Sequence, residues 1–339
     1  MPIFNQGTGG GGASLSPIIV VSAPTGSTVT CKKGSTVLTA EESSGTWSFA
    51  IPAYGTWTVT GVNAGVTVEK TVEVTAIEVY FVTLEFIPAV LNNATWAQVK
   101  QASDSGVASN YWAVGDTKQI TINGKLSDGL TLSNYSTYVY IIGFNHNSER
   151  EGIGIAFGGF KTAQANGTDI CLCDNGYGSS KSSGQWFNMN NNNSTTGGWN
   201  GRNMRNNTLP VVKAALPSDL QAVLKTTTLY TDNTGGGSTS ASYVTQTQDE
   251  LYLLAEFEIF GARTYANTAE RNYQMQYAYY VAGNSKVKYK HNSTATAALW
   301  WERSVRAAHA YSFCYVYTDG TASSNDANRS YGLVLAFKV

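Results

Sequence analysis

The sequence predicts two domains of different fold class, an all-β sandwich followed by an α+β domain. Three observations support this prediction. At 339 residues, the chain exceeds the ~250–300 residues beyond which one hydrophobic core seldom grows. Short apolar segments separated by turn signals fill residues 17–85. Residues 95–339 combine helix-capping motifs with strand-like segments, a mixture typical of an α+β domain.

Residues 1–16 are predicted to form a flexible leader, because the run Gly9–Gly12 and its Ser and Ala neighbours cannot bury a core. The β-sandwich begins near Pro17, and glycine-containing turns such as Pro24–Gly26 separate its strands. We expect Trp47 and Trp57 in its core rather than on a ligand-binding surface. Seven short strands with this spacing indicate a small sandwich. They are predicted at 18–22, 28–32, 35–39, 46–51, 55–62, 66–74 and 77–85.

A linker at 86–94 leads to the second domain, which opens with a helix. Thr95 and Gln98 have the spacing of a capping box, in which the two side chains satisfy each other's backbone N–H groups. The helix should run to about Ser105 and stop at Gly106.

The middle of the second domain mixes strands, helices and one long loop. Two further capping boxes are predicted, at Ser218 with Gln221 and at Asn267 with Glu270. The glycine- and asparagine-rich stretch 174–208 is either a functional loop or a disordered one. The predicted elements are strands at 111–122 and 137–144, an extended segment at 249–260, and helices at 218–225 and 268–280.

The C-terminal segment carries the clearest pattern. The indoles Trp300 and Trp301 precede the segment 311–318, in which large aromatic and smaller side chains alternate. A period of two is typical of a half-buried strand. Its aromatic face consists of Tyr311, Phe313, Tyr315 and Tyr317. Asp319–Gly320 predicts a turn, and a polar run then leads to an apolar closing strand at 332–337.

Composition limits the classes of partner. Charged residues make up 13% of the chain and the formal net charge is −1, so the basic stripe of a nucleic-acid-binding protein is not expected. No apolar run approaches the ~20 residues of a membrane span, so we expect no membrane insertion. The first residues lack the basic and apolar regions of a signal peptide. Gly, Ser, Thr, Asn and 20 tyrosines carry the polarity, which suits an extracellular surface but also any β-rich secreted protein.

Motifs for catalysis, metals and cofactors are sparse. The histidines His146, His291 and His309 are scattered, and no metalloprotease, nucleophile-elbow or phosphate-loop motif occurs. We therefore predict no catalytic residue and no cofactor. Cys171 and Cys173 would share one face of a strand, either as a metal pair or, as we prefer, as buried small residues. Four cysteines are too few for a disulfide framework in a chain of this length.

The C-terminal motif resembles the end of a C-type-lectin-like domain of the formylglycine-generating-enzyme type. It is similar to a domain of unknown function that ends many phage and prophage tail proteins. The resemblance rests on an aromatic pair followed by Arg-Ser, a glycine turn and a Tyr-Gly strand. These positions are Trp300, Trp301, Arg303, Ser304, Gly320, Tyr331 and Gly332. Val305 stands where the family often has proline, and similar motifs extend the resemblance over most of 95–339.

The first domain resembles a different family. Segments 23–31, 46–49 and 54–59 are similar to immunoglobulin-like, carboxypeptidase-regulatory-type spacer modules, which recur in phage structural proteins. The resemblance implies an immunoglobulin-like sandwich that carries no chemistry of its own.

Together, the resemblances imply a phage tail-fibre or receptor-binding protein, an adhesin that binds a protein or glycan receptor on the host cell surface. Such a chain would be made in the bacterial cytoplasm, join the virion and attach to other tail proteins through its N-terminal region. Fibre tips of this kind suggest a homotrimer. The alternatives are a formylglycine-generating or glycan-processing enzyme and a purely structural virion decoration protein. The calcium motifs of sugar-binding C-type lectins are absent, so we predict no metal site.

The variable proteins of diversity-generating retroelements resemble this arrangement, with a constant frame and diversified C-terminal positions. The resemblance implies a frame in which Arg303 pairs with a buried carboxylate or carbonyl. The predicted frame is Trp300, Trp301, Arg303, Gly320 and Gly332. Rigid tyrosines beside adaptable polar groups are typical of a binding face. The predicted ligand-binding residues are Arg306, His309, Tyr311, Tyr315, Tyr317, Asn325, Asp326 and Asn328. The alternative is that the tyrosine row only packs the sheet.

Overall fold

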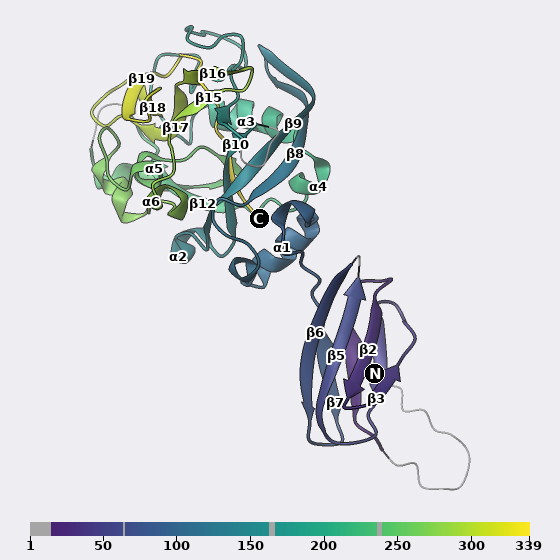
Figure 1. Ribbon diagram of the computed structural model, residues 1–339. Helices are drawn as coiled ribbons and strands as arrows, with labels where there is room; N and C mark the ends of the chain where they lie inside the picture. Colours follow the sequence, from purple (N-terminus) through teal and green to yellow (C-terminus); the bar gives the residue numbers. More distant parts are fainter. Residues whose placement is uncertain (1–14, 64, 163–166, 236–238) are drawn as a thin grey trace. The chain divides into compact units, whose positions relative to one another are not determined.

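The computed structural model describes residues 15–63, 65–162, 167–235 and 239–339. The chain divides into two compact units between Pro88 and Ala89, a boundary inside the predicted linker (Figure 1). Of the predicted leader 1–16, residues 1–14 lie outside the described residues. No helix in the described ranges combines the length and the apolar character that crossing a membrane requires.

Among its described residues, the first unit has seven strands in two sheets, close to the predicted positions. They are β1 (Ile18–Ser22), β2 (Thr28–Lys33), β3 (Thr36–Thr39), β4 (Thr46–Ala50), β5 (Gly55–Asn63), β6 (Val66–Val74) and β7 (Val79–Thr83). One sheet has the order β4-β1-β7 and the other the order β3-β2-β5-β6. Strands β1 and β7 run parallel, whereas the other pairs in these sheets are antiparallel.

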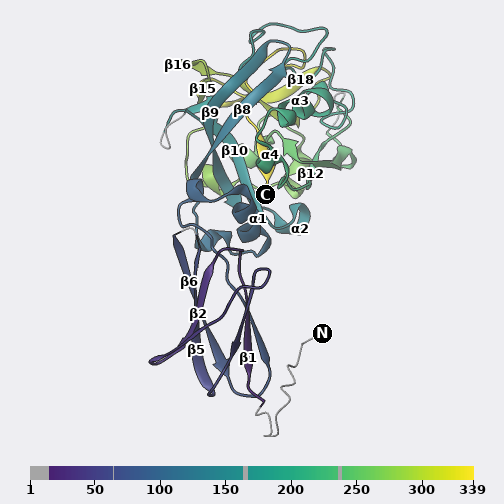
Figure 2. The same ribbon diagram turned by 90° about the vertical axis from the view of Figure 1, so that its right-hand side faces the viewer.

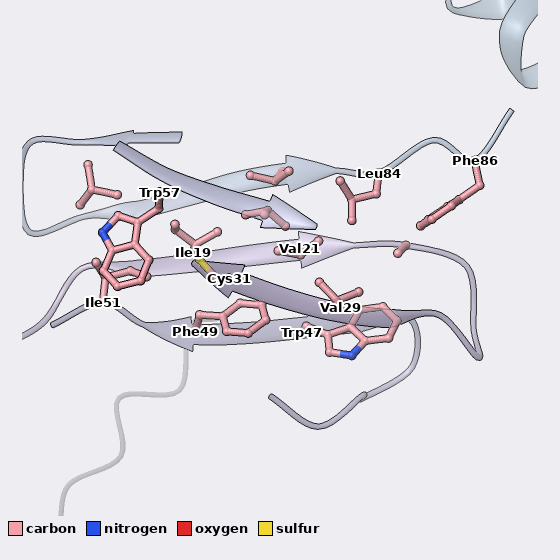
Figure 3. Packing of buried hydrophobic residues seen from close by; sticks show 14 residues of the cluster. Ile19, Val21, Val29, Cys31, Trp47, Phe49, Ile51, Trp57, Leu84 and Phe86 are labelled. Carbon is pink, nitrogen blue, oxygen red and sulfur yellow. The ribbon is translucent and has the colours of Figure 1, made fainter. Parts of the chain in front are cut away.

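The two sheets enclose one apolar core (Figure 3). Because side chains alternate along a strand, β1 turns Ile19 and Val21 inward while β4 turns Trp47 and Phe49 inward. Trp57 of β5 closes the opposite side, and its Nε1 donates to the Ala53 carbonyl at 2.9 Å. Trp47 and Trp57 are 2% and 1% exposed, which confirms their predicted place in the core. Each such side chain contributes about 1.5–3 kcal/mol through burial.

Outside the undescribed residues 163–166 and 236–238, the second unit contains thirteen strands in three sheets. They are β8 (Thr117–Ser127), β9 (Leu130–Phe144), β10 (Ile155–Lys161), β11 (Asp169–Cys171), β12 (Thr227–Asp232), β13 (Val244–Asp249), β14 (Leu251–Tyr252), β15 (Lys288–Lys290), β16 (Ser293–Ala298), β17 (Trp300–Val305), β18 (Ser312–Val316), β19 (Ala322–Asp326) and β20 (Ala336–Lys338). The largest sheet runs β14-β20-β10-β11-β15-β16, with the β8–β9 hairpin joined to β10. The smaller sheets are β12-β13 and β17-β18-β19.

Short helices and loops surround these strands in both views (Figures 1 and 2). The α-helices are α1 (Trp96–Asp104), α2 (Ser148–Glu151), α3 (Leu209–Ala214), α4 (Ser218–Gln221), α5 (Glu256–Phe260) and α6 (Ala278–Val281). Single turns of 3₁₀ helix lie at Leu91–Asn93, Ala108–Asn110, Ala241–Tyr243 and Thr268–Asn272, and a π-helical turn lies at Met204–Thr208. Helix α1 begins with the predicted capping box, in which Thr95 and Gln98 bond each other's backbone N–H groups.

Two predicted elements differ from the structure because side chains make other bonds. The predicted strand at 111–122 starts only at Thr117, since the Asp116 carboxylate accepts from Ala113 N and closes a turn. The predicted extended segment 249–260 becomes helical at α5. There, Glu258 Oε2 accepts from Ala255 N at 2.9 Å, and Gly261, with φ +69°, ends the helix.

Two predicted capping boxes are wrong. Ser218 is the first residue of α4 rather than its cap, and Gln221 donates to the Leu216 carbonyl at 2.7 Å. Asn267 does cap the next turn, but that turn is a 3₁₀ helix that ends at Asn272. The Glu270 side chain points inward, where it accepts from Asp232 N and Ser304 Oγ, so the predicted helix 268–280 does not form as one element.

Candidate binding surface at the C-terminal strands

The predicted frame is buried, apart from Gly320, which is half-buried. All residues of β17 and β18 are buried, so β18 packs on both faces, whereas the segment 311–318 was predicted to be a half-buried strand. The indole N–H of Trp301 donates to the Phe187 carbonyl, and that of Trp300 donates to the Lys286 carbonyl, both at 2.9 Å. Large rings with satisfied N–H groups hold the two strands in one position.

Arg303 confirms its predicted pairing with a buried carboxylate. Its guanidinium is fully buried and binds both carboxylate oxygens of Glu258, with Nη1 at 2.6 Å from Oε2. Nη1 also donates to the Leu253 carbonyl at 2.8 Å, and Nε donates to Thr231 Oγ1 at 2.9 Å. This bidentate pair joins β17 to α5 and fixes their relative orientation.

Glu302 has no partner of this kind. It is fully buried, and neither carboxylate oxygen accepts a hydrogen bond within the described part of the chain. Burial raises the pKa of Glu302 well above its usual value, and the nearby Glu256 and Glu270 raise it further. The raised pKa favours the protonated, neutral form of the Glu302 carboxyl group. Burial also raises the pKa of the Cys314 thiol well above its usual range, which makes Cys314 unreactive.

Both frame glycines are required by the backbone. Gly320 adopts φ +85° in the turn after β18, a conformation that favours glycine. A Cβ on Gly332 would clash with Cys171 Sγ and lie 2.8 Å from the Leu299 carbonyl oxygen. Gly332 therefore lets the last segment of the chain pass close to β11 and β17.

Four of the predicted binding residues gather at the start of β18. The His309 and Tyr311 rings are 4.1 Å apart, and Asp326 lies opposite Ser312 in the β18–β19 register. Burial lowers the pKa of His309, and the Arg306 charge lowers it further, whereas Asp326 raises it. Arg306 Nη1 donates to Ser324 Oγ at 3.2 Å. We call Arg306, His309, Tyr311 and Asp326 the polar–aromatic group.

Tyr315 does not share the exposure expected for the tyrosine row. It is 5% exposed and packs against Trp301 and Tyr331, with ring centroids 6.0 and 5.3 Å away. Asn325 Nδ2 donates to the Tyr331 hydroxyl at 2.7 Å on this side of the sheet. Tyr331 covers the middle of the tyrosine row, and only its ends, Tyr311 and Tyr317, remain 44% exposed.

The last predicted position, Asn328, lies in the turn after β19 rather than on the sheet. Its carbonyl accepts from Lys181 N at 2.8 Å, which places it beside the 174–208 loop. Alternation of side chains puts Asn325 and Asp326 on opposite faces of β19. The eight predicted residues therefore do not form one continuous face.

Neighbours that the sequence did not single out complete the surface. Arg306 lies over the Tyr265 ring, with the guanidinium 5.3 Å from the ring centroid. In the 174–208 loop, Thr195 N donates to the Ala310 carbonyl at 2.8 Å, and Thr195 Oγ1 donates to the His309 carbonyl at 3.1 Å. In the sequence, only the length and the glycine- and asparagine-rich composition of this loop indicated that it could be functional.

Cys171 and Cys173 are buried, with their sulfur atoms 3.7 Å apart. His291 Nδ1 accepts from the backbone N of Cys173 at 3.1 Å. Throughout the described ranges, no three His, Cys, Asp or Glu side chains converge in a way that could hold a metal ion. The burial of both side chains agrees with the interpretation as buried small residues.

The fold and this surface define a β-rich chain whose loops present polar and aromatic side chains on a buried strand frame. The chain belongs to the family described as Domain of unknown function (DUF6273), whose model matches residues 169–339. This region includes the frame and the polar–aromatic group. No curated protein matches the chain.

Proposed function

We propose that the chain is a receptor-binding protein of a phage tail, an adhesin that binds a host cell-surface ligand. In this proposal the second unit is a C-type-lectin-like binding domain, and the first unit is an immunoglobulin-like spacer. The observation that carries the proposal is the exposure of Tyr311, Tyr317 and polar neighbours at the ends of a strand that is otherwise fully buried.

A rigid frame favours binding because fewer side chains lose conformational freedom when the ligand arrives. Here Trp300, Trp301 and Arg303 hold the frame, and the exposed residues lie in the adjoining loops. Tyrosine offers a large contact area with few rotatable bonds, and Arg306 and Asp326 offer charges of both signs. Centrally buried tyrosine or arginine anchors contribute about 2 kcal/mol or more each on binding.

The proposal includes a virion location, attachment to other tail proteins through the N-terminal region, and assembly as a homotrimer. Three linked copies would convert a weak contact into avidity for a cell surface. Light scattering of the full chain measures the assembly state, and a monomeric mass at micromolar concentration would contradict the trimer.

The test is binding of the fluorescently labelled full chain to a panel of bacterial strains, measured by flow cytometry. We expect the double variant Tyr311→Ala/Tyr317→Ala to lose binding to any strain that the unaltered chain labels. Its melting temperature should change little, because both rings are exposed. Tyr54→Ala, which alters a tyrosine that is 52% exposed in the first unit, is the matched control and should bind normally. Normal labelling by the double variant would contradict the proposed surface.

A further inference from the structure

A cleft of about 580 Å³ lies in the second unit, and none of the residues that line it belongs to the polar–aromatic group. Helix α5 and the segment 261–276 form its walls. The residues that define it are Phe257, Arg263, Thr268, Arg271, Gln274 and Met275. We call it the arginine cleft. Its volume falls in the range of pockets that enclose a ligand side chain or a small molecule.

The arginine cleft has an excess of positive charge. Arg263 and Arg271 are exposed in its lining, and no acidic side chain lines it. The Arg271 side chain makes no hydrogen bond or ion pair with the described residues. Arg263 uses one guanidinium nitrogen to hold the Ala266 carbonyl at 2.9 Å, and its other nitrogens have no partner within the described ranges.

The glutamates of the same walls cannot neutralise these arginines, because they face inward. Glu256 accepts from the backbone N–H groups of Thr264, Tyr265 and Ala266. Glu258 binds Arg303, and Glu270 accepts from Asp232 N, Ser304 Oγ and Gln274 Nε2. All three glutamates are fully buried. The three carboxylates therefore make their hydrogen bonds and ion pairs inside the unit, whereas the guanidinium groups of Arg263 and Arg271 face the solvent.

The other residues that line the arginine cleft suit a ligand with both polar and apolar groups. Gln274 is 6% exposed, and its amide oxygen has no hydrogen-bond donor among the described residues. Its Nε2 donates to the Tyr230 carbonyl at 2.8 Å. Phe257 supplies a buried apolar wall, and Met275, at 57% exposed, supplies an adaptable one.

We propose that the arginine cleft binds an acidic peptide segment of a partner protein. Arg263 and Arg271 would bind Asp or Glu carboxylates, since guanidinium groups match carboxylates bidentately. An apolar peptide side chain would contact Met275, which is 57% exposed. An acidic sugar fits less well, because the lining offers no exposed aromatic ring on which a sugar could stack. The inference is independent of the proposed receptor-binding function, and the two have separate readouts.

The test is calorimetric titration of the full chain with a short polyglutamate peptide. We expect saturable binding that weakens as salt is added, because exposed charges are screened. The double variant Arg263→Gln/Arg271→Gln should bind roughly tenfold more weakly or worse, which corresponds to about 1.4 kcal/mol or more. Lys32→Gln/Lys70→Gln removes the same charge from exposed positions of the first unit and should bind normally.

Four results would overturn the proposal. Three of them are no binding of polyglutamate by the unaltered chain, equal weakening in the lysine control, and equal binding of a polyglutamine peptide of the same length. Tighter binding of an oligouronate of matched charge would assign the cleft to a saccharide and would also contradict it. The single variant Arg271→Gln separates lost binding from misfolding, because the Arg271 side chain makes no hydrogen bond or ion pair with the described residues. This variant should by itself weaken polyglutamate binding.

Discussion

The two units of this protein differ in what they bury. Within the described part of the first unit, Ser27 is the only polar side chain that is buried, and the core is otherwise apolar. The second unit buries a set of charged side chains, among them Glu256, Glu270, Glu302 and Arg303. The first unit is thus held by hydrophobic burial, whereas the second depends on the correct pairing and protonation of buried ions.

The difference indicates that apolar burial stabilises the first unit, whereas buried ion pairs mainly fix the arrangement of elements in the second. A buried ion pair contributes little net stability compared with apolar residues of the same volume, but losing one partner is costly. Such pairs therefore tolerate few alternative arrangements of the elements that they join. In the second unit the buried ions surround the strands that carry the candidate binding surface. The comparison predicts that substitutions of charged residues and changes of pH alter the stability of the second unit more than that of the first.

The largest expected effect is that of Arg303→Met. The variant leaves Glu258 buried without its cation, so the second unit should lose about 3–5 kcal/mol of stability. The first unit should be unaffected. Hydrogen exchange read by mass spectrometry reports the two units separately. Arg271→Met, at an exposed arginine without ion pairs, is the matched control and should change stability by less than about 0.5 kcal/mol. Similar losses in the two variants would remove the distinction between buried and exposed charge.

A smaller effect of opposite sign is expected from Glu302→Gln. Folding raises the pKa of Glu302 above the usual 4.5, so the folded chain must keep a proton that the unfolded chain releases at higher pH. The stability contributed by this carboxyl group is present below about pH 4.5 and is lost as pH rises. Glutamine is neutral throughout, so the stability of the variant should increase relative to that of the unaltered chain as pH rises above 4.5.

The pH dependence of that gain is the sharper measurement. Denaturant unfolding at acidic and at mildly alkaline pH should show the gain increasing by up to about 1.4 kcal/mol per pH unit. Comparing the variant with the unaltered chain at each pH cancels the other titrating groups, such as His146, whose pKa burial lowers to about 4. A gain that is the same at both pH values would show that Glu302 is not protonated on folding.

The smallest effect is expected from Ile19→Val in the first unit. Removal of one buried methyl group should cost about 0.5–1.5 kcal/mol, with no dependence on pH. Denaturant unfolding of the full chain, together with hydrogen exchange in the first unit, measures it. Val37→Ala, at an exposed position of β3, is the control and should be nearly neutral. A pH-dependent loss in Ile19→Val would mean that the first unit does not behave as a purely apolar core.

Local patterns in the sequence were sufficient for the first unit. Its strands are close to their predicted positions. In a two-sheet sandwich, the alternation of apolar and polar residues along a strand determines which side chains face the core. The capping box at Thr95 was equally readable, since all its partners lie within four residues. The pairing of Arg303 with a buried carboxylate was also predicted, although Glu258 as the partner was not.

The tertiary structure alone decided the fate of Glu270 and Tyr315. Glu270 has the spacing of a capping residue, but its carboxylate bonds Asp232 N and Ser304 Oγ, which are distant in sequence, so the predicted helix stops. Tyr315 alternates like an exposed residue, yet Trp301 and Tyr331 cover it. The sequence by itself determined the strands of the first unit, the capping box at Thr95 and the types of side chain at the surface. Which of those side chains remain exposed depends on long-range contacts that periodicity cannot encode.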